Sequence, residues 1–349
     1  LEHYAKSHVA VPGIELRQLV PDLSAAVPVL IEIVKGGHPR FATKSLKILG
    51  LIGPPAGDAV PLATELLKSD FYDMRAEAAA ALGGFGVGSP EVILALVESL
   101  DREKETEQRF VQPYRPGSGQ GRGGRSQLPS GTLRANVAVS LGRLAAHPDL
   151  SIPALAVVLD LSYMGDSGRC DLAATALAEF GEDARSAIPD LVDQLHCRPM
   201  SQPALAALRR IDPGLSETVQ QLIRNLASDN RETQLRSIVT LALLREKSKP
   251  AIESLQNAFD GDDEAMAAWA AYTLWKIDLE RYSLQPALPV LIETLENPKM
   301  QCLNKLGVLA DLASIGSEAR PAVPAIRKAI DRGDFGRSGD VYLDPVSYT

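Results

Sequence analysis

The chain is 349 residues long, only 5% of its residues are aromatic, and its formal net charge at pH 7 is −8. The acidic balance argues against a general nucleic-acid binder, while a local basic patch remains open. The sequence contains no run of about 18 apolar residues, which excludes a transmembrane helix, and Cys170, Cys197 and Cys302 have no CxxC spacing that would indicate a metal or redox site.

One short pattern recurs along the chain and is clearest in residues 59–86. After Pro61, which suits a first helical turn because its missing N–H would have no partner there, apolar residues fall on one face of a predicted helix. A second helix is predicted from Asp73 as N-cap, with Gly86 at a left-handed C-cap. Two such short helices cannot bury their apolar faces alone, so we expect them to stack on copies of themselves.

The same first-helix position returns at a nearly regular interval. Successive copies are separated by 31 to 36 residues, except for one step of 59 residues that requires an insertion. The equivalent positions are Pro28, Pro61, Leu94, Pro153, Pro189, Gln220, Glu253, Pro289 and Pro324. This count predicts eight helix pairs plus one unpaired helix.

The repeat resembles HEAT repeats, in particular the short bacterial kind that includes those grouped with phycobilisome lyases. The resemblance covers residues 25–332 and implies an all-α fold, an α-solenoid of about eight to nine stacked HEAT-like helix pairs. Residues 1–24 do not fit the pattern and are expected to form an irregular N-terminal cap, while residues 333–349 are expected to form a C-terminal tail. Because the first residue is Leu and not Met, export stays open, although a soluble cytoplasmic protein is favoured.

Residues 102–131 are predicted to form an insertion loop between the third first-helix and its partner, which begins near Thr132. Gly, Pro, Ser, Gln and Arg dominate this segment and no apolar periodicity is present. Two hypotheses remain open: a solvated insertion, or a basic arm that binds phosphates or stacks on single-stranded nucleic acid. The residues of such an arm are Arg109, Tyr114, Arg115, Arg122 and Arg125.

Second helices of HEAT arrays usually line the concave surface, so their outward positions are candidate partner contacts. These positions are Lys44, Lys47, Arg143, Arg210, Arg236, Trp269, Tyr272 and Lys276. Trp269, Tyr272 and Lys276 share one helical stripe, and surface Trp and Tyr beside a cation are typical of a binding hot spot. The alternative is that Trp269 fills space against a neighbouring helix pair. Trp275 stands where other repeats have Gly or Ala, and we expect it to be structural.

No arrangement of residues indicates catalysis, a metal site or a cofactor. HEAT proteins that are iron hydroxylases place His-Glu dipeptides on facing helices, but none of the five histidines here is followed by Glu or paired at helical spacing. Alkylpurine DNA glycosylases also have HEAT-like repeats, with Trp, Asp and Arg in a basic groove. Trp269, Tyr272 and Asp278 are only a loose parallel to that set.

The sequence therefore predicts a non-enzymatic protein-binding scaffold or an accessory subunit of a larger assembly. We expect a protein partner, with nucleic acid as the less favoured one. The competing hypothesis is a HEAT-like enzyme that acts on nucleic acid or on a bilin-type small molecule, as alkylpurine DNA glycosylases and bilin lyases do. A buried polar cluster with perturbed pKa values would favour the enzyme, whereas exposed aromatic and charged residues would favour binding.

Overall fold

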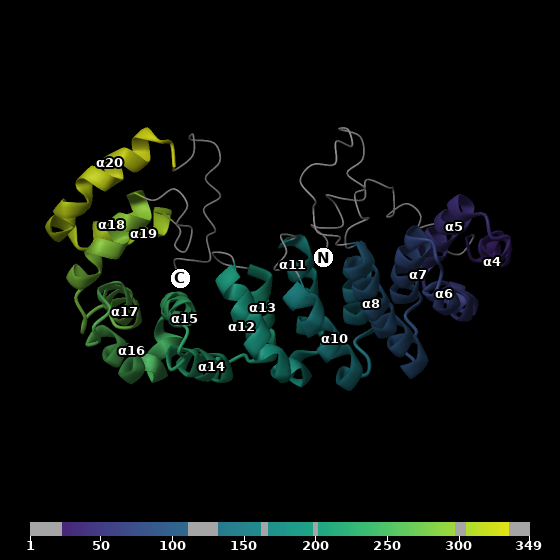
Figure 1. Ribbon diagram of the computed structural model, residues 1–349, viewed down its shortest axis with the longest axis horizontal. Coiled ribbons are helices and arrows are strands. Elements are labelled where there is room, and N and C mark those ends of the chain that lie inside the picture. The colour runs from purple at the N-terminus through teal and green to yellow at the C-terminus, as the bar shows by residue number, and fades with distance from the viewer. Residues whose placement is uncertain (1–22, 111–131, 162–166, 198–201, 297–304, 335–349) are drawn as a thin grey trace. The chain divides into compact units, whose positions relative to one another are not determined.

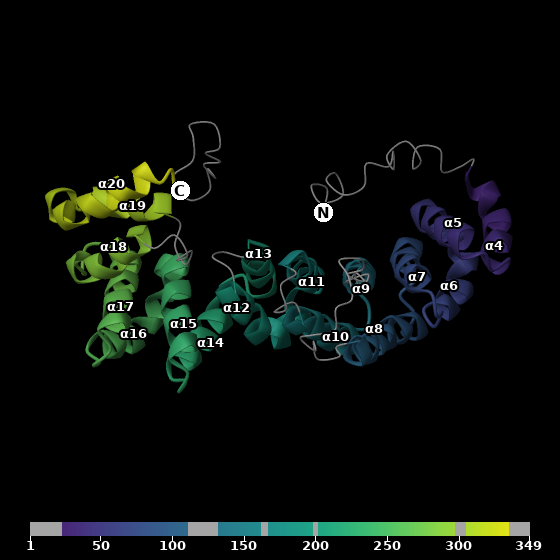
Figure 2. The ribbon, with the colours of Figure 1, turned by 45° about the horizontal axis from the view of Figure 1, so that its top comes forward.

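In the computed structural model, most of the described residues are helical. α-Helices alternate with turns and short 3-10 helices, and no strand occurs in the described ranges (Figure 1, Figure 2). The all-α solenoid predicted from the repeat is confirmed. The description covers residues 23–110, 132–161, 167–197, 202–296 and 305–334.

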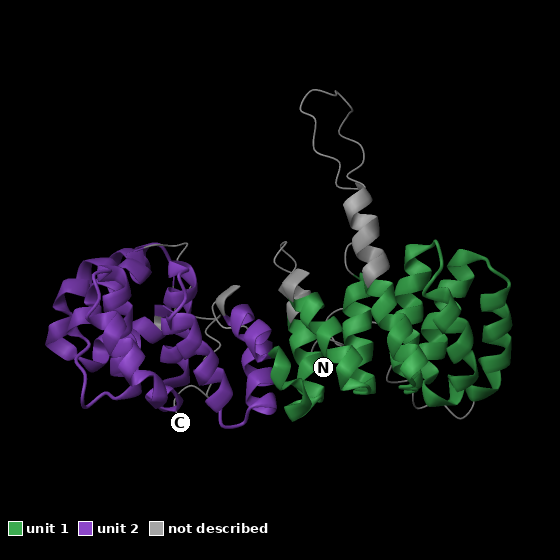
Figure 3. Cartoon of the chain, turned by 60° about the horizontal axis from the view of Figure 1, so that its bottom comes forward, with its two compact units in different colours: residues 1–187 green, residues 188–349 purple. Residues whose placement is uncertain are grey.

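Contacts divide the chain into two compact units, residues 1–187 (unit 1) and residues 188–349 (unit 2) (Figure 3). In unit 1, each second helix packs on its own first helix, and from the second pair onward also on the second helix of the preceding pair. The four described pairs are α4 (Val27–Lys35) with α5 (Pro39–Ile52), α6 (Val60–Leu66) with α7 (Tyr72–Phe85), α8 (Pro90–Phe110) with α9 (Thr132–Leu144), and α10 (Pro148–Leu161) with α11 (Ser167–Glu179). Its 3-10 helices are η1 (Ser24–Ala26), η2 (Pro54–Ala59) and η4 (Gly181–Ala187).

Unit 2 contains four further pairs and one helix, α20 (Val323–Asp331), that has no second helix among the described residues. The pairs are α12 (Ile188–Cys197) with α13 (Gln202–Ile211), α14 (Ser216–Leu226) with α15 (Arg231–Leu244), α16 (Ile252–Phe259) with α17 (Glu264–Ile277), and α18 (Leu288–Glu296) with α19 (Lys305–Ser314). The 3-10 helices are η5 (Arg245–Ala251), η6 (Gln285–Ala287) and η7 (Gly316–Ala322). Eight described pairs and an unpaired helix match the repeat count.

Local sequence sets the helix ends much as the repeat predicts. Pro61 lies in the first turn of α6, and Gly86 ends α7 with a left-handed φ of 73°. The predicted N-cap of α7 is wrong by two residues, because the helix begins at Tyr72 and Phe71 is the N-cap. Asp73 therefore lies in the first turn, where its carboxylate faces the positive end of the helix dipole.

The predicted insertion loop begins too early. α8 continues to Phe110, so residues 102–110, including Arg109, belong to a helix. Glu, Lys, Arg and Gln dominate these residues and favour a helix without any apolar face, which a search for apolar periodicity does not detect. The remaining arm residues lie outside the described part of the chain: Tyr114, Arg115, Arg122 and Arg125. Nearly all of the predicted cap and tail, residues 1–22 and 335–349, also lies outside it.

The second helices of unit 1 approach one another through small residues. A Cβ added to Gly84 of α7 would lie 2.2 Å from the backbone oxygen of Gly50 on α5. Between α7 and α9, the Ser140 hydroxyl donates to the backbone oxygen of Ala79 at 2.7 Å. Backbone contact of this kind brings α5, α7, α9 and α11 into one tight layer, with the first helices on the other side (Figure 2).

Candidate functional site

The predicted aromatic stripe on α17 is buried. Trp269 and Tyr272 are only 4% and 3% exposed, so the prediction that both face outward as partner contacts is wrong. Their rings meet edge to face with centroids 6.0 Å apart. On the side of α15, the Thr273 hydroxyl donates to the backbone oxygen of Ile238 at 2.9 Å. Since Trp275 is also buried, the alternative that the aromatic residues fill space is the correct one.

A carboxylate on α19 joins the stripe to the next helix pair. The Tyr272 hydroxyl donates to Asp311 Oδ2 at 2.7 Å, and Lys276 Nζ donates to Oδ1 at 2.8 Å and to Oδ2 at 3.1 Å. The side chains of Lys276 and Asp311 are only 14% and 12% exposed. Lys276 Nζ also lies 5.7 Å from the ring centroid of Tyr272 and 5.4 Å from that of Trp275. Lys276 therefore links α17 to α19 through an ion pair and is not the outward partner contact that the sequence predicted.

Asp311 was missed by the sequence reasoning, which considered only the residues of α17 itself. A signal was present, because Asp311 is the one acidic residue in the otherwise apolar segment 306–313. An acid in the middle of an apolar helix requires a partner when its face is buried.

The predicted cations on the other second helices are exposed, with one exception. Arg236 of α15 is half-buried and forms an ion pair with Glu232 one turn earlier on the same helix. The exposed ones are Lys44 and Lys47 on α5, Arg143 on α9 and Arg210 on α13. Exposure makes these four residues available for contacts, while their binding role stays a prediction.

Lys47 faces an acidic neighbour across the α5–α7 contact. Burial raises the pKa of the half-buried Glu77 on α7, the positive charge of Lys47 lowers it, and the negative charge of Asp73 raises it. The tight layer of unit 1 therefore presents a face of mixed charge, in which the exposed Lys47 lies near the half-buried carboxylate of Glu77.

Two further features bear on the enzyme hypothesis. Of the three residues in the loose parallel to alkylpurine DNA glycosylases, Trp269 and Tyr272 are buried, and Asp278 Oδ1 accepts the backbone N–H of Arg281 at 3.2 Å. Within the described ranges, His, Cys, Asp and Glu form no group of three or more that could hold a metal ion. Among the helices of those ranges, none has both the length and the apolar character needed to cross a bilayer.

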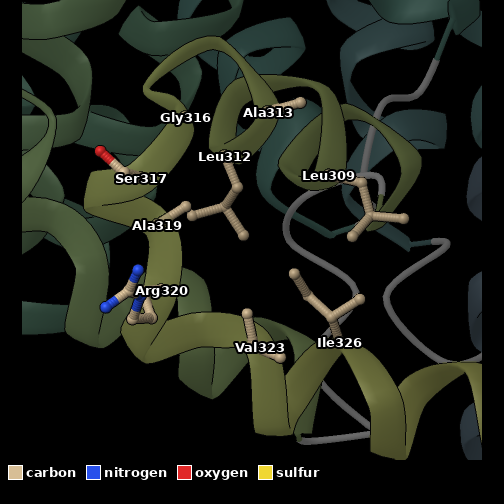
Figure 4. A pocket seen from close by; sticks show the side chains of 9 residues that line it. All are labelled: Leu309, Leu312, Ala313, Gly316, Ser317, Ala319, Arg320, Val323 and Ile326. Atoms are coloured by element: carbon tan, nitrogen blue, oxygen red, sulfur yellow. The ribbon is translucent and has the colours of Figure 1, made fainter.

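An apolar hollow of about 350 Å³ lies between α19, η7 and α20. Leu309, Leu312 and Ile326 point into it, and Arg320 lies at its edge (Figure 4). The other apolar side chains around it are Ala313, Ala319 and Val323. No candidate residue from the sequence falls here; the only signal was a ninth first helix without a partner helix.

Comparison with known proteins confirms the repeat. Residues 27–111 match the family described as HEAT repeats, as the resemblance predicted. No sequence among curated proteins matches the chain.

Solved structures similar to the chain include the X-ray structure of YibA from E. coli, with 16% sequence identity, coverage of 92% of this chain and 98% of that chain, and a TM-score of 0.38. A crystal structure of an engineered protein has 21% identity, covers 72% of this chain and 96% of that chain, and has a TM-score of 0.33. A chain from the computational design of self-assembling cyclic homo-oligomers has 16% identity, covers 92% and 98%, and has a TM-score of 0.16.

Proposed function

We propose that this chain, whose residues 27–111 match HEAT repeats, is a non-enzymatic protein-binding scaffold or an accessory subunit of a larger assembly. Stacked helix pairs expose an extended surface to a partner while each pair is supported only by its neighbours. The observation that carries the proposal is the exposure of Lys44 and Lys47 on the tight second-helix layer of unit 1.

Lys44 and Lys47 lie three residues apart on α5, so both ammonium groups project from one face. Among the described residues, neither takes part in an ion pair. Two exposed cations on a rigid helix favour a partner that presents acidic side chains, and they raise its association rate at low salt. The partner surface is therefore expected to be acidic where it meets α5.

The buried cluster on α17 and α19 is assigned a structural role in this proposal. A catalytic group must be within hydrogen-bond reach of a substrate atom. The Tyr272 hydroxyl, the Lys276 ammonium and the Asp311 carboxylate are instead bonded to one another. Such a cluster holds two helices together and leaves recognition to exposed side chains elsewhere.

The test compares two charge reversals of equal size in unit 1. Lys44→Glu with Lys47→Glu changes the second-helix layer. Lys35→Glu with Arg185→Glu changes exposed cations on α4 and η4, where both residues are paired with neighbouring acids. Quantitative affinity capture from the source organism should recover a partner with the wild-type chain and with the α4/η4 variant. With the α5 variant, the amount of that partner recovered should be lower by about tenfold or more.

Two further readouts complete the design. Capture of that partner should weaken as salt rises, because exposed charges are screened. Equal recovery by both variants would remove α5 from the interface, and turnover of a substrate by the chain alone would contradict the scaffold role.

A further inference from the structure

The first helix pair of the array, α4 with α5, has no preceding pair among the described residues (Figure 1). In each later pair of unit 1, the second helix packs on the second helix of the preceding pair. The corresponding side of α5 therefore has no described helix against it, and the α5–α7 contact shows which residues lie there.

One stripe of α7 makes the contact with α5. A Cβ added to Gly50 on α5 would lie 2.8 Å from Ala81 Cα, and one added to Gly84 would lie 2.2 Å from the backbone oxygen of Gly50. Met74 and Glu77 precede these two residues of α7 at helical spacing, so all four belong to one stripe. Met74 is only 5% exposed, which shows that the start of the stripe is buried where a preceding second helix is present.

The same stripe on α5 faces the side without a preceding helix. Both helices have fourteen residues and both end at a glycine, so their positions correspond one to one. Phe41 takes the place of Met74 but is 56% exposed. Lys44, in the place of Glu77, is also exposed. The remaining two positions of the stripe are apolar and half-buried, and they are Ile48 and Leu51.

The first helix of the pair extends this apolar surface. Val29 and Ile33 lie one turn apart on α4 and are 61% and 40% exposed. They stand one and five residues after the repeat proline. In α20, the same positions hold Ala325 and Ala329, which are buried, and α20 packs on the preceding first helix α18. The first pair therefore exposes, on both of its helices, positions that are covered further along the array.

The surface formed by these residues, here called the N-terminal end face, consists of five apolar side chains and one cation. They are Val29, Ile33, Phe41, Ile48, Leu51 and Lys44. The open end of a helical array requires cover, because its outer interface is as apolar as the internal ones. A contiguous apolar surface with a polar rim also marks a site of interaction.

The cation decides which kind of helix can cover the end face. Across the α5–α7 contact, burial raises the pKa of Glu77, and the positive charge of Lys47 on α5 partly offsets that rise, so the two side chains are neighbours. Lys44 has the place of Glu77 one pair earlier. A helix that packs on α5 as α5 packs on α7 therefore presents its counterpart of Lys47 to Lys44. An acid there forms an ion pair, whereas α5 of a second copy would bring one lysine against another, and like charges repel.

We propose that an acidic amphipathic helix of a partner protein covers the N-terminal end face and stacks on α4 and α5 as a preceding repeat would. Its apolar side contacts Val29, Ile33 and Phe41. An acidic side chain in its middle pairs with Lys44. This inference rests on the scaffold role proposed above and names the element through which the acidic partner is recognised.

The test measures the binding of labelled peptides to the full chain. The probe is a 14-residue amphipathic peptide, as long as α5, with leucine at i, i+3, i+4 and i+7 and glutamate on both flanks. Ile33→Ser with Phe41→Ser removes two apolar contacts of the end face. In the matched control, Leu94→Ser with Phe71→Ser, the two residues are exposed to a similar extent on α8 and at the N-cap of α7 but lie outside the end face.

Fluorescence anisotropy should show wild-type affinity for the control variant. The end-face variant should bind the acidic peptide at least about tenfold more weakly, since each apolar side chain buried in the contact contributes about that factor. Hydrogen exchange in α4 and α5 of the wild-type chain should slow when the acidic peptide is bound. Equal affinity of the end-face and control variants would overturn the proposal.

A charge exchange tests the pairing with Lys44. A second peptide, with lysine in place of every glutamate, should bind the wild-type chain at least about tenfold more weakly than the acidic one. Lys44→Glu in the chain should narrow or reverse this preference. Equal affinity of the two peptides for the wild-type chain would also overturn the proposal.

The peptide assay does not depend on capture of a natural partner, so the two proposals can fail separately. If Lys44→Glu with Lys47→Glu loses the captured partner while Ile33→Ser with Phe41→Ser keeps it, the scaffold role stands and the end-face helix is wrong. If both variants keep the partner, α5 lies outside the interface and both proposals fail.

Other occupants of the end face give different results. Protection of α5 that rises with protein concentration in the absence of peptide would show a second copy on the end face. Peptide binding that occurs only after removal of residues 1–22 would show that the chain covers the face itself. Either result overturns the proposal.

Discussion

Two contacts between consecutive second helices show how one repeat produces different interiors. In unit 1, α5 and α7 meet backbone to backbone, and a Cβ on Gly50 would lie only 2.8 Å from Ala81 Cα. In unit 2, α17 and α19 have few close backbone approaches, and Tyr272, Lys276 and Asp311 connect them through long side chains.

The difference teaches that repeat register alone does not determine what fills the space between helix pairs. Where Gly and Ala occupy the facing positions, the helices close up until backbone atoms touch. Where Trp and Tyr occupy them, the side chains keep the helices apart, and the polar ends of those side chains need partners on the other helix. A change of residue size at one position therefore changes which side chains the neighbouring repeat needs at its facing positions.

The largest expected loss of stability comes from removing a buried aromatic side chain of α17. Trp269→Ala should lower the free energy of unfolding by about 3–5 kcal/mol, because it leaves a cavity next to Tyr272. Urea denaturation, with hydrogen exchange to localise the loss to unit 2, measures it. Phe259→Ala, at a residue 39% exposed on the neighbouring helix α16, is the control and should cost much less. Unchanged stability together with lost partner binding would restore the recognition role.

A smaller loss is expected from the polar tie alone. Tyr272→Phe keeps the ring and removes the hydroxyl that donates to Asp311. Because this hydrogen bond goes to a charged acceptor in a buried place, its loss should cost about 1.5–3 kcal/mol. In the control, Tyr282→Phe, the lost hydroxyl accepts a bond from the neutral amide of Gln256 at 3.1 Å. An equal loss of unfolding free energy in the two variants would mean that the hydrogen bond from Tyr272 to Asp311 stabilises the chain no more than a bond between neutral groups.

The close contact between α5 and α7 is tested by adding one methyl group. Gly84→Ala would place a Cβ 2.2 Å from the backbone oxygen of Gly50, so α5 and α7 must move apart. Overpacking of this kind should cost about 1–3 kcal/mol, even though alanine favours the helix. Gly57→Ala has nothing within 4 Å of its new Cβ and should be nearly neutral. A tolerated Gly84→Ala would show that the α5–α7 contact is not set by backbone touch.

The smallest effect concerns an exposed tie that links α15 and α17 at their N-terminal ends. Arg231 forms a bidentate pair with Asp263, and together with the N–H of Met266 it holds the pKa of Asp263 at about 2, below its usual 3.8. A depressed pKa in the folded chain means that the contribution to stability is present above the unfolded value and is lost as pH falls through the folded one.

Asp263→Asn isolates the contribution of the carboxylate charge to stability, because asparagine can still cap α17 and cannot titrate. Urea denaturation should show a stability difference between wild type and variant that is constant above about pH 5 and shrinks toward pH 2. A stability difference that does not change over this pH range would show that the Arg231–Asp263 ion pair does not contribute to the stability of unit 2.

Much of the architecture could be predicted because its signals are local. Pro61 in a first turn and Gly86 at a helix end act within a few residues of themselves, and the spacing of apolar residues defines each helix within one repeat. The same reasoning failed for residues 102–110, where a helix without an apolar face gives no periodic signal. It also placed Trp269 and Tyr272 outside, although the size of these residues in an Ala-rich array had already suggested the alternative of packing.

The amino-acid sequence by itself determined the repeat and the number of described helix pairs, since each depends on a pattern of about one repeat in length. Only the tertiary structure decided which face of α17 is covered, because the acceptor of the Tyr272 hydroxyl lies 39 residues further along the chain. It also decided that α19, η7 and α20 enclose an apolar hollow. Spacing between neighbouring repeats depends on side chains from two repeats at once, and no single repeat contains that information.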